Sequence, residues 1–186
     1  MMRIGLISDT HGVFADDVKE FLEPVDQIWH AGDFGTLECA RQIAEFRPLT
    51  GVYGNCDGLD IRQEYPSFRL IDCEGLRILM THIGLRRGSY WAYNPGRPLY
   101  DAQAKALLDT YHPDIFVCGH THIPQVFRDV KSGFIFMNPG SCGLQNTPEV
   151  PRMALRFQIE RGRICGLEKC ELPQLSKKLV ENSIKK

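Results

Sequence analysis

Short apolar runs alternate with amphipathic segments along the first part of the chain. The apolar runs cover residues 3–8, 27–30 and 49–53, and each has the length of a β-strand. Residues 16–22 and 36–46, which lie between these runs, carry apolar side chains at helical spacing. Strands that alternate with helices usually pair in parallel and have the helices packed outside the sheet. The pattern therefore predicts a β-α-β-α-β unit.

The second predicted helix has an N-terminal signal and one apolar face. Thr36 precedes the first turn, and its hydroxyl can accept a hydrogen bond from a backbone N–H group there. The face that we expect to pack against the sheet consists of Leu37, Ala40, Ile43 and Ala44. This helix should therefore begin at Thr36 and lie outside the sheet.

Antiparallel pairing enters near the middle of the chain. Residues 68–80 form two strand-like halves on either side of Glu74 and Gly75, which predicts a β-hairpin. Farther along, we expect an amphipathic helix over residues 102–111 and strands over residues 114–118, 125–129, 134–137, 153–160 and 163–170. These elements together predict an α/β fold with two mixed β-sheets between helical layers, which is a four-layer αββα sandwich.

Composition indicates one globular domain. The chain has 186 residues, of which 43% are hydrophobic and 24% are charged, enough to bury a full core. We expect a single domain over residues 1–173 and a lysine-containing basic tail over residues 174–186. The 22 basic and 23 acidic residues give a formal net charge of -1, so no long nucleic acid is expected as a partner. The same balance argues against an exonuclease, which needs many phosphate contacts.

The cysteines and the N-terminus bear on cellular location. The seven cysteines are an odd number without a Cys-x-x-Cys pair, and we interpret them as reduced thiols. The chain passes from Arg3 directly into an apolar strand, without the pattern of a signal peptide, and no apolar run has the length of a membrane span. We therefore expect a cytoplasmic protein without membrane insertion.

Polar side chains that can bind metals follow the predicted strands. They are Asp9, His11, Asp33, Asn55, His82, His120 and His122. Ligands gather at the carboxyl ends of parallel strands, where loops carry polar groups. One such residue by itself is more often a turn or capping residue, but seven of them in this arrangement indicate a site for two metal ions.

The residues around these ligands resemble a known family. Ser8-Asp9-Thr10-His11, Gly32-Asp33, Gly54-Asn55, Thr81-His82 and Gly119-His120-Thr121-His122 look like the successive motifs of the calcineurin-like metallophosphoesterase superfamily. Their short spacing resembles the small prokaryotic phosphodiesterase branch, and the resemblance covers about residues 3–143. The same branch is similar in fold to the phosphoesterase-like subunit of the eukaryotic retromer, which serves as a protein-binding scaffold.

The resemblance implies a metallophosphoesterase fold and a dinuclear centre. By analogy, Asp9, His11 and His122 would bind one ion, Asn55, His82 and His120 would bind the other, and Asp33 would bridge them. Asp33, Asn55, Cys56 and His82 would take part in catalysis. The expected ions are divalent, with manganese favoured and iron, zinc, nickel or magnesium as alternatives.

The implied activity is hydrolysis of a phosphodiester by a metal-activated hydroxide, without a covalent nucleophile on the protein. Two alternatives stay open, namely a phosphomonoesterase and a non-catalytic interaction scaffold on the same fold. A scaffold has no catalytic reason to keep seven metal ligands, and all seven are present in this chain.

Cys56 departs from the wider superfamily, which places a histidine after the asparagine. That histidine protonates the leaving oxygen or stabilises the transition state, and a neutral thiol donates a hydrogen bond more weakly than an imidazolium. Small prokaryotic relatives often resemble this chain in having Gly-Asn-Cys-Asp. Cys56 could therefore assist the leaving group or merely pack against its neighbours, and the sequence does not decide between the two.

Four further features of the sequence receive roles outside the set of predicted ligands. We interpret His30 as a hydrogen-bonded core residue, and His112 as a capping or exposed residue at a helix end. Asp57 could anchor the Asn55 loop. The turn at residues 138–141 looks like the family's tight turn, which supports the loop of His120 and His122.

Residues 83–100 follow His82 without a regular pattern, and such long loops are more often functional than accidental. Arg86, Arg87 and Arg97 could bind the phosphate oxygens of a small phosphoester, such as a nucleotide-derived one, while the aromatic residues of the loop stack on a base. Tyrosine, tryptophan and arginine are also enriched at subunit interfaces, so a homo-oligomer is the other interpretation.

Overall fold

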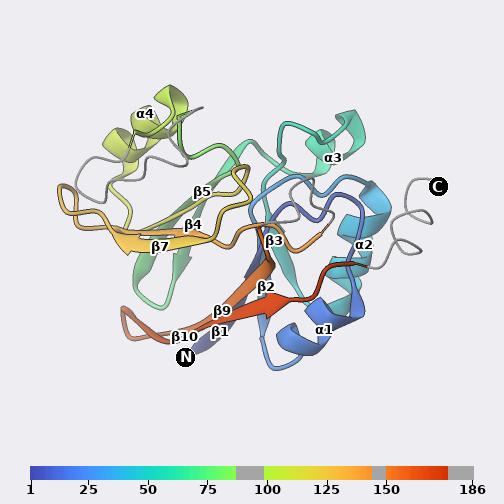
Figure 1. The fold of residues 1–186 in the computed structure, drawn as a ribbon. Helices are drawn as coiled ribbons and strands as arrows, with labels where there is room; N and C mark the ends of the chain where they lie inside the picture. The colour runs from blue at the N-terminus through green and yellow to red at the C-terminus, as the bar shows by residue number, and fades with distance from the viewer. Residues whose placement is uncertain (87–98, 144–149, 176–186) are drawn as a thin grey trace.

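Two five-stranded β-sheets form the centre of the molecule (Figure 1). The computed structural model describes residues 1–86, 99–143 and 150–175. In chain order its elements are β1 (Met2–Ile7), α1 (Asp16–Leu22), β2 (Gln27–His30), α2 (Leu37–Phe46), β3 (Leu49–Gly51), α3 (Leu59–Glu64), β4 (Phe68–Cys73), β5 (Leu76–Thr81), α4 (Ala102–Tyr111), β6 (Ile115–Val117), β7 (Gln125–Arg128), β8 (Ile135–Asn138), β9 (Arg152–Glu160) and β10 (Arg163–Leu172).

The first sheet joins the two halves of the chain, in the order β10-β9-β1-β2-β3. Strands β1, β2 and β3 pair in parallel, as the alternation of strands and helices predicts. Strand β9 pairs antiparallel with β1 and with β10. The sheet is therefore mixed, and its parallel strands end at one common edge.

The second sheet comes from the middle of the chain, in the order β4-β5-β6-β8-β7. The hairpin β4-β5 turns at Glu74 and Gly75, whose φ angles of 48° and 86° are those of a tight hairpin turn. Strands β5, β6 and β8 are parallel, whereas β7 is antiparallel to β8. Both predictions, the hairpin and a second mixed sheet, are confirmed.

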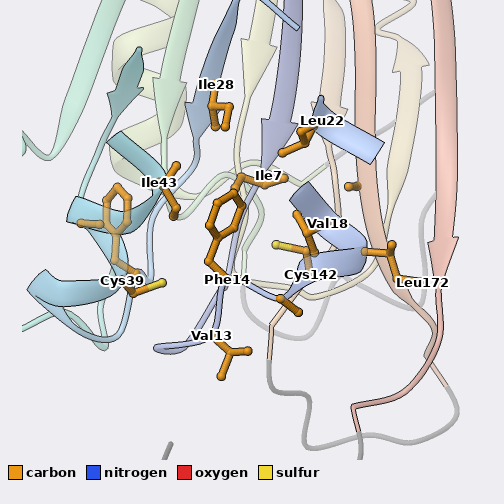
Figure 2. Close-up of a cluster of buried hydrophobic side chains, with 14 of the residues drawn as sticks. Ile7, Val13, Phe14, Val18, Leu22, Ile28, Cys39, Ile43, Cys142 and Leu172 are labelled. Atoms are coloured by element: carbon orange, nitrogen blue, oxygen red, sulfur yellow. The ribbon is translucent and has the colours of Figure 1, made fainter. Parts of the chain in front are cut away.

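Alternate residues of β1 face different layers. Ile4 and Leu6 pack between the two sheets, in a cluster with Trp29 and Met80. Ile7 points to the opposite side, where α1 and α2 cover the first sheet (Figure 2). Helix α4 covers the outer face of the second sheet through Ala104 and Leu108, which pack against side chains of β5, β6 and β8. This arrangement is the predicted four-layer αββα sandwich.

Helix α2 has the predicted cap and a slightly rotated apolar face. The Oγ1 atom of Thr36 accepts a hydrogen bond of 3.1 Å from the backbone N–H of Cys39, which confirms the cap. Cys39, Ala40 and Ile43 are buried, but Ala44 is exposed, so its assignment to the packed face was wrong. Cys39 occupies the stripe because it lies four residues before Ile43 on the same side of the helix.

Three local features differ from the sequence expectations or lie beyond them. Strand β3 ends at Gly51, two residues earlier than predicted, and helix α3 (Leu59–Glu64) was not predicted. A helix of 6 residues is too short to show a clear apolar period. The predicted basic tail lies outside the described residues from position 176 onward.

None of the helices in the described ranges has the length and apolar character required to cross a lipid bilayer.

Candidate metal centre

The predicted ligands lie in loops that follow strands of both sheets. Asp9 and His11 follow β1, Asp33 follows β2 and Asn55 follows β3, whereas His82 follows β5 and the pair His120 and His122 follows β6. Asp9, Asp33 and His82 are buried, with at most 3% of each residue exposed. The packing of the two sheets brings these loops to one edge of the sandwich.

The backbone is strained at most of these positions. Outside glycine, the described chain has eight residues with positive φ, and five of them are predicted ligands: Asp9 (54°), His11 (46°), Asp33 (58°), His120 (69°) and His122 (59°). Residues other than glycine rarely adopt this left-handed backbone conformation, which costs about 1–3 kcal/mol per residue. Such a concentration of strain is typical of a functional site that the surrounding fold holds in place.

Two groups of side chains meet at hydrogen-bond distance. The Nε2 atom of His122 lies 3.2 Å from Oδ1 of Asp9 and 3.2 Å from Nε2 of His11. The Nε2 atom of His82 lies 3.2 Å from Oδ2 of Asp33 and 3.9 Å from Oδ1 of Asp9. Asp9 therefore adjoins both groups.

Two buried atoms in this cluster have no well-aligned hydrogen bond in the part of the chain that the structure describes, namely Oδ1 of Asp9 and Nε2 of His82. The other oxygen of Asp9 accepts hydrogen bonds from the hydroxyl of Ser8 (2.5 Å) and the backbone N–H of His120 (3.1 Å). Buried polar atoms are normally satisfied, so a carboxylate oxygen and an imidazole nitrogen without partners at one place suit the binding of a cation.

His82 is oriented as a metal ligand. Its Nδ1 lies 2.7 Å from the carbonyl oxygen of Ala31, which can only accept a hydrogen bond. Nδ1 therefore carries a proton and donates it, so Nε2 is the ring nitrogen that faces the centre. This arrangement, in which a backbone carbonyl fixes the tautomer, is usual for histidines that bind metals.

The charges of the cluster require a nearby cation. Burial by itself would raise the pKa of Asp33, but the nearby imidazole of His82 and the N–H of Cys56 hold that pKa well below its usual range. Burial likewise would lower the pKa of His82, but Asp33 and Asp9 raise it to about 9. Two ionised carboxylates at this depth need a compensating positive charge, which either a proton on His82 or a bound metal ion can supply.

Three sets of side chains have ligand atoms that lie within 4.8 Å of one another. They are Asp9 with His11 and His122, Asp9 with Asp33 and His82, and His11 with Asp33 and Cys56. Asp9, His11 and Asp33 each belong to two of these sets, so two carboxylates adjoin more than one candidate position. The donors are carboxylate oxygens, imidazole nitrogens and one thiol, which suit first-row divalent metals.

The sequence profile of the calcineurin-like phosphoesterase superfamily domain matches residues 2–161. The chain belongs to this superfamily. A protein of Methanothermobacter thermautotrophicus described as a "Probable metallophosphoesterase" is 30% identical over 169 residues, which cover 86% of this chain and 88% of that protein. The resemblance seen in the sequence motifs is thereby confirmed. The superfamily consists of metal-dependent phosphoesterases, so the protein is assigned to this class of hydrolases.

Solved structures share the fold of this phosphoesterase. One, described as a novel archaeal phosphodiesterase, has a TM-score of 0.64 and 21% identity and covers 92% of this chain and 100% of its own. Another is Vps29 from Entamoeba histolytica complexed with zinc, with a TM-score of 0.59, 17% identity, and coverage of 91% of this chain and 99% of its own. At these identities the similarity concerns the fold alone.

The superfamily residues differ in how closely the structure groups them. Asp9, His11, Asp33, His82 and His122 share the sets described above. The ring of His120 adjoins that of His82, with centroids 5.3 Å apart. Asn55 and Cys56 are exposed. Of the loop arginines, Arg86 is exposed, and Arg87 and Arg97 lie outside the described residues.

The supporting residues of the phosphoesterase centre have the roles that the sequence suggested. Asp57 accepts hydrogen bonds from the backbone N–H groups of Gly54 (2.7 Å) and Gly35 (2.9 Å), so it anchors the Asn55 loop. Asn138 donates to the carbonyl oxygen of Gly119 (2.8 Å) and thereby holds the loop of His120 and His122. His112 is exposed and ends α4 with a φ of 43°.

Ser8 was not assigned a role from the sequence, although it precedes Asp9 in the quoted motif. It is fully buried, and its hydroxyl lies 2.5 Å from Oδ2 of Asp9 and 3.3 Å from the carbonyl oxygen of Gly32. Ser8 therefore sets the orientation of the Asp9 carboxylate. The signal was its position directly after the apolar end of β1 and before Asp9.

His30 links two ligand loops of the phosphoesterase. Its Nδ1 accepts a hydrogen bond of 3.1 Å from the N–H of Gly32, so the ring proton is on Nε2, which lies 3.0 Å from the hydroxyl of Thr10. The ring stacks on Phe34, with centroids 3.7 Å apart, and is fully buried. Burial lowers the pKa of His30 to about 3, so the ring stays neutral in the folded protein. The interpretation as a core residue is confirmed.

The buried neutral ring predicts acid sensitivity. Between pH 6.5 and about 3, unfolded His30 binds a proton that folded His30 does not, so the free energy of unfolding should fall as the pH decreases through this range. The slope from this residue is at most about 1.4 kcal/mol per pH unit. Urea unfolding at pH 7, 6 and 5 should show a weaker pH dependence for His30→Gln than for wild type. The exposed His112→Gln is the control, and an unchanged slope in His30→Gln would contradict the prediction.

Proposed function

We propose that this protein hydrolyses phosphodiesters at a centre of two divalent metal ions. The observation that carries the proposal is the pair of unsatisfied buried atoms, Oδ1 of Asp9 and Nε2 of His82, among the sets of side chains that could bind a cation. One ion would lie with Asp9, His11 and His122. The other would lie with Asn55, His82 and His120, and Asp33 would bridge the two. Manganese is the ion that we favour, because hard oxygen and borderline nitrogen donors are mixed here.

Bound metal ions in such a centre supply Lewis-acid activation of water and neutralise charge on the phosphoryl oxygens. The residues of the chain hold the reacting groups in place. Ser8 and the N–H of His120 fix the Asp9 carboxylate, and the N–H of Cys56 fixes Asp33 at 2.8 Å. Ala31 fixes the ring of His82. These contacts keep the ligands in one geometry, which lowers the cost of reaching the transition state.

The preference for a diester rests on the resemblance to the small prokaryotic branch. The description of one similar structure as an archaeal phosphodiesterase supports the same direction. The scaffold function is the alternative, because the small prokaryotic branch is similar in fold to the phosphoesterase-like subunit of the retromer, which serves as a protein-binding scaffold. We favour the enzyme because a scaffold needs neither the strained backbone at five ligands nor the buried carboxylates.

Metal removal tests the proposal. We expect chelated protein to lose hydrolysis of bis-p-nitrophenyl phosphate and to regain it when Mn²⁺ is added, with two ions bound per chain in metal analysis. The rate with p-nitrophenyl phosphate should be lower than with the diester. Hydrolysis that persists after chelation would contradict the metal-dependent reaction. A higher rate with the monoester would favour the phosphomonoesterase, and no hydrolysis with any ion would favour the scaffold.

The loop after His82 is proposed to bind the substrate phosphate through Arg86, Arg87 and Arg97. Removing a charged hydrogen bond costs about 1.5–3 kcal/mol, so each alanine variant should lose about 10- to 150-fold in kcat/KM and retain its metal. Diester kinetics and metal analysis measure both quantities. Arg128→Ala, which changes an exposed arginine on β7, is the control. Unchanged kinetics together with dissociation of an oligomer would place these arginines at a subunit interface instead.

A further inference from the structure

Cys56 lies beside the metal centre without being one of its superfamily ligands. Its Sγ belongs to a set with His11 and Asp33 in which the ligand atoms lie within 4.8 Å of one another. The residue is exposed, so burial against neighbours does not account for it. Of the cysteines in the described residues, none but Cys56 joins such a set.

The main chain holds Cys56 in this place. Its N–H donates a hydrogen bond of 2.8 Å to Oδ1 of Asp33, so the backbone of Cys56 is fixed beside that carboxylate. The guanidinium of Arg62 donates to the carbonyl oxygens of Asp57 (2.8 Å) and Asn55 (3.2 Å) and braces the loop on both sides of Cys56. In a zinc site, bond lengths of about 2.3 Å to sulfur and 2.0–2.1 Å to nitrogen place two ligands within roughly 4.4 Å. Small side-chain rotations would therefore bring the three atoms around one ion.

We infer that Cys56 is a thiolate ligand of the ion held by His11 and Asp33, and that it raises the affinity of this position for thiophilic divalent cations such as Zn²⁺, Co²⁺ and Cd²⁺. The inference rests on the proposed metal centre and adds a ligand to it. Binding is a ligand exchange in which the S–H bond breaks, the proton passes to solvent and a sulfur–metal bond forms. Soft sulfur ligands favour these ions over Mn²⁺, which prefers oxygen donors.

A ligand role differs from the roles considered for Cys56 on the sequence. A thiolate bound to a metal has no proton to give to a leaving oxygen, so the residue would not act as the acid that replaces the superfamily histidine. It would instead change which metal the centre retains. This difference can be measured without any substrate.

The experiment uses the metal-free full chain titrated with Co²⁺, because a cobalt–thiolate bond gives a charge-transfer absorption in the near ultraviolet. We expect this band in wild type, its loss in Cys56→Ser, and its retention in Cys165→Ser, which changes an exposed thiol on β10 outside the three sets. The affinity for Cd²⁺, measured by calorimetry, should fall by at least about tenfold in Cys56→Ser, since even removal of a residue that only supports a ligand costs 10- to 100-fold. The affinity for Mn²⁺ should change by less than about threefold.

The outcomes separate this inference from the proposed function. Stoichiometric Co²⁺ binding by wild type without the band, or a band that persists in Cys56→Ser, would overturn the ligand role while leaving the metal centre intact. If wild type binds neither Co²⁺ nor Mn²⁺, both the proposed metal centre and the inference are overturned. Circular dichroism of Cys56→Ser serves to show that the exposed substitution leaves the fold unchanged.

Discussion

Replacement of Asp33 by asparagine is expected to abolish phosphoester hydrolysis and to lower the metal content of the protein. Asp33 is one of the two carboxylates that each belong to two of the three candidate sets, and its Oδ2 lies 3.2 Å from Nε2 of His82. The amide keeps the size of the side chain but loses the negative charge that a bridging ligand needs. Metal affinity should fall by more than about 10- to 100-fold, the range for residues that merely support ligands.

Asp72→Asn is the matched control for this variant. Asp72 lies on β4 with 83% of its side chain exposed, so the same chemical change there should leave metal content and kcat unaltered. Metal content by atomic emission and kcat with an aryl phosphodiester measure the effect. Hydrolysis of the diester by Asp33→Asn at the wild-type rate would contradict both the bridging role and the dinuclear centre.

Gly54→Ala is expected to disable the centre by a steric route. A Cβ atom at position 54 would lie 2.0 Å from Oδ1 and 2.4 Å from the backbone nitrogen of Asp33, far inside van der Waals contact. Because φ at Gly54 is outside the left-handed region, the clash and not the backbone conformation opposes the alanine. Asp33 must shift, so metal affinity should fall by more than about tenfold. The free energy of unfolding should fall by about 1–3 kcal/mol.

Gly133→Ala separates loss of stability from loss of the site. A Cβ atom there would meet nothing within 4 Å, but φ is +82°, so the substitution is strained in the backbone alone. It should cost about 1–2 kcal/mol of stability and leave metal binding intact. Metal titration and urea unfolding of both variants measure the two effects. Wild-type metal affinity in Gly54→Ala would show that Asp33 does not need its observed position.

Most helices and strands were predictable because their signals are local. The apolar period of residues 16–22, the cap at Thr36 and the turn at Glu74 and Gly75 are each contained within one element, and all three are confirmed. Helix α3 has only 6 residues and was missed for lack of a period. The exposure of Ala44 depended on how α2 is rotated against the sheet, which the spacing of apolar residues does not specify.

The sequence by itself determined the family, the mixed α/β class and the identity of the candidate ligands, because residues at strand ends keep a recognisable order along the chain. Only the tertiary structure decided how those ligands meet. Asp9 and His122 are far apart in sequence but 3.2 Å apart in space, since β1 and β6 belong to different sheets whose ends converge. The unsatisfied atoms of Asp9 and His82, the strained φ angles and the place of Cys56 beside Asp33 likewise arise from packing between loops. Such contacts depend on the orientation of both sheets, and no local pattern in the sequence encodes that orientation.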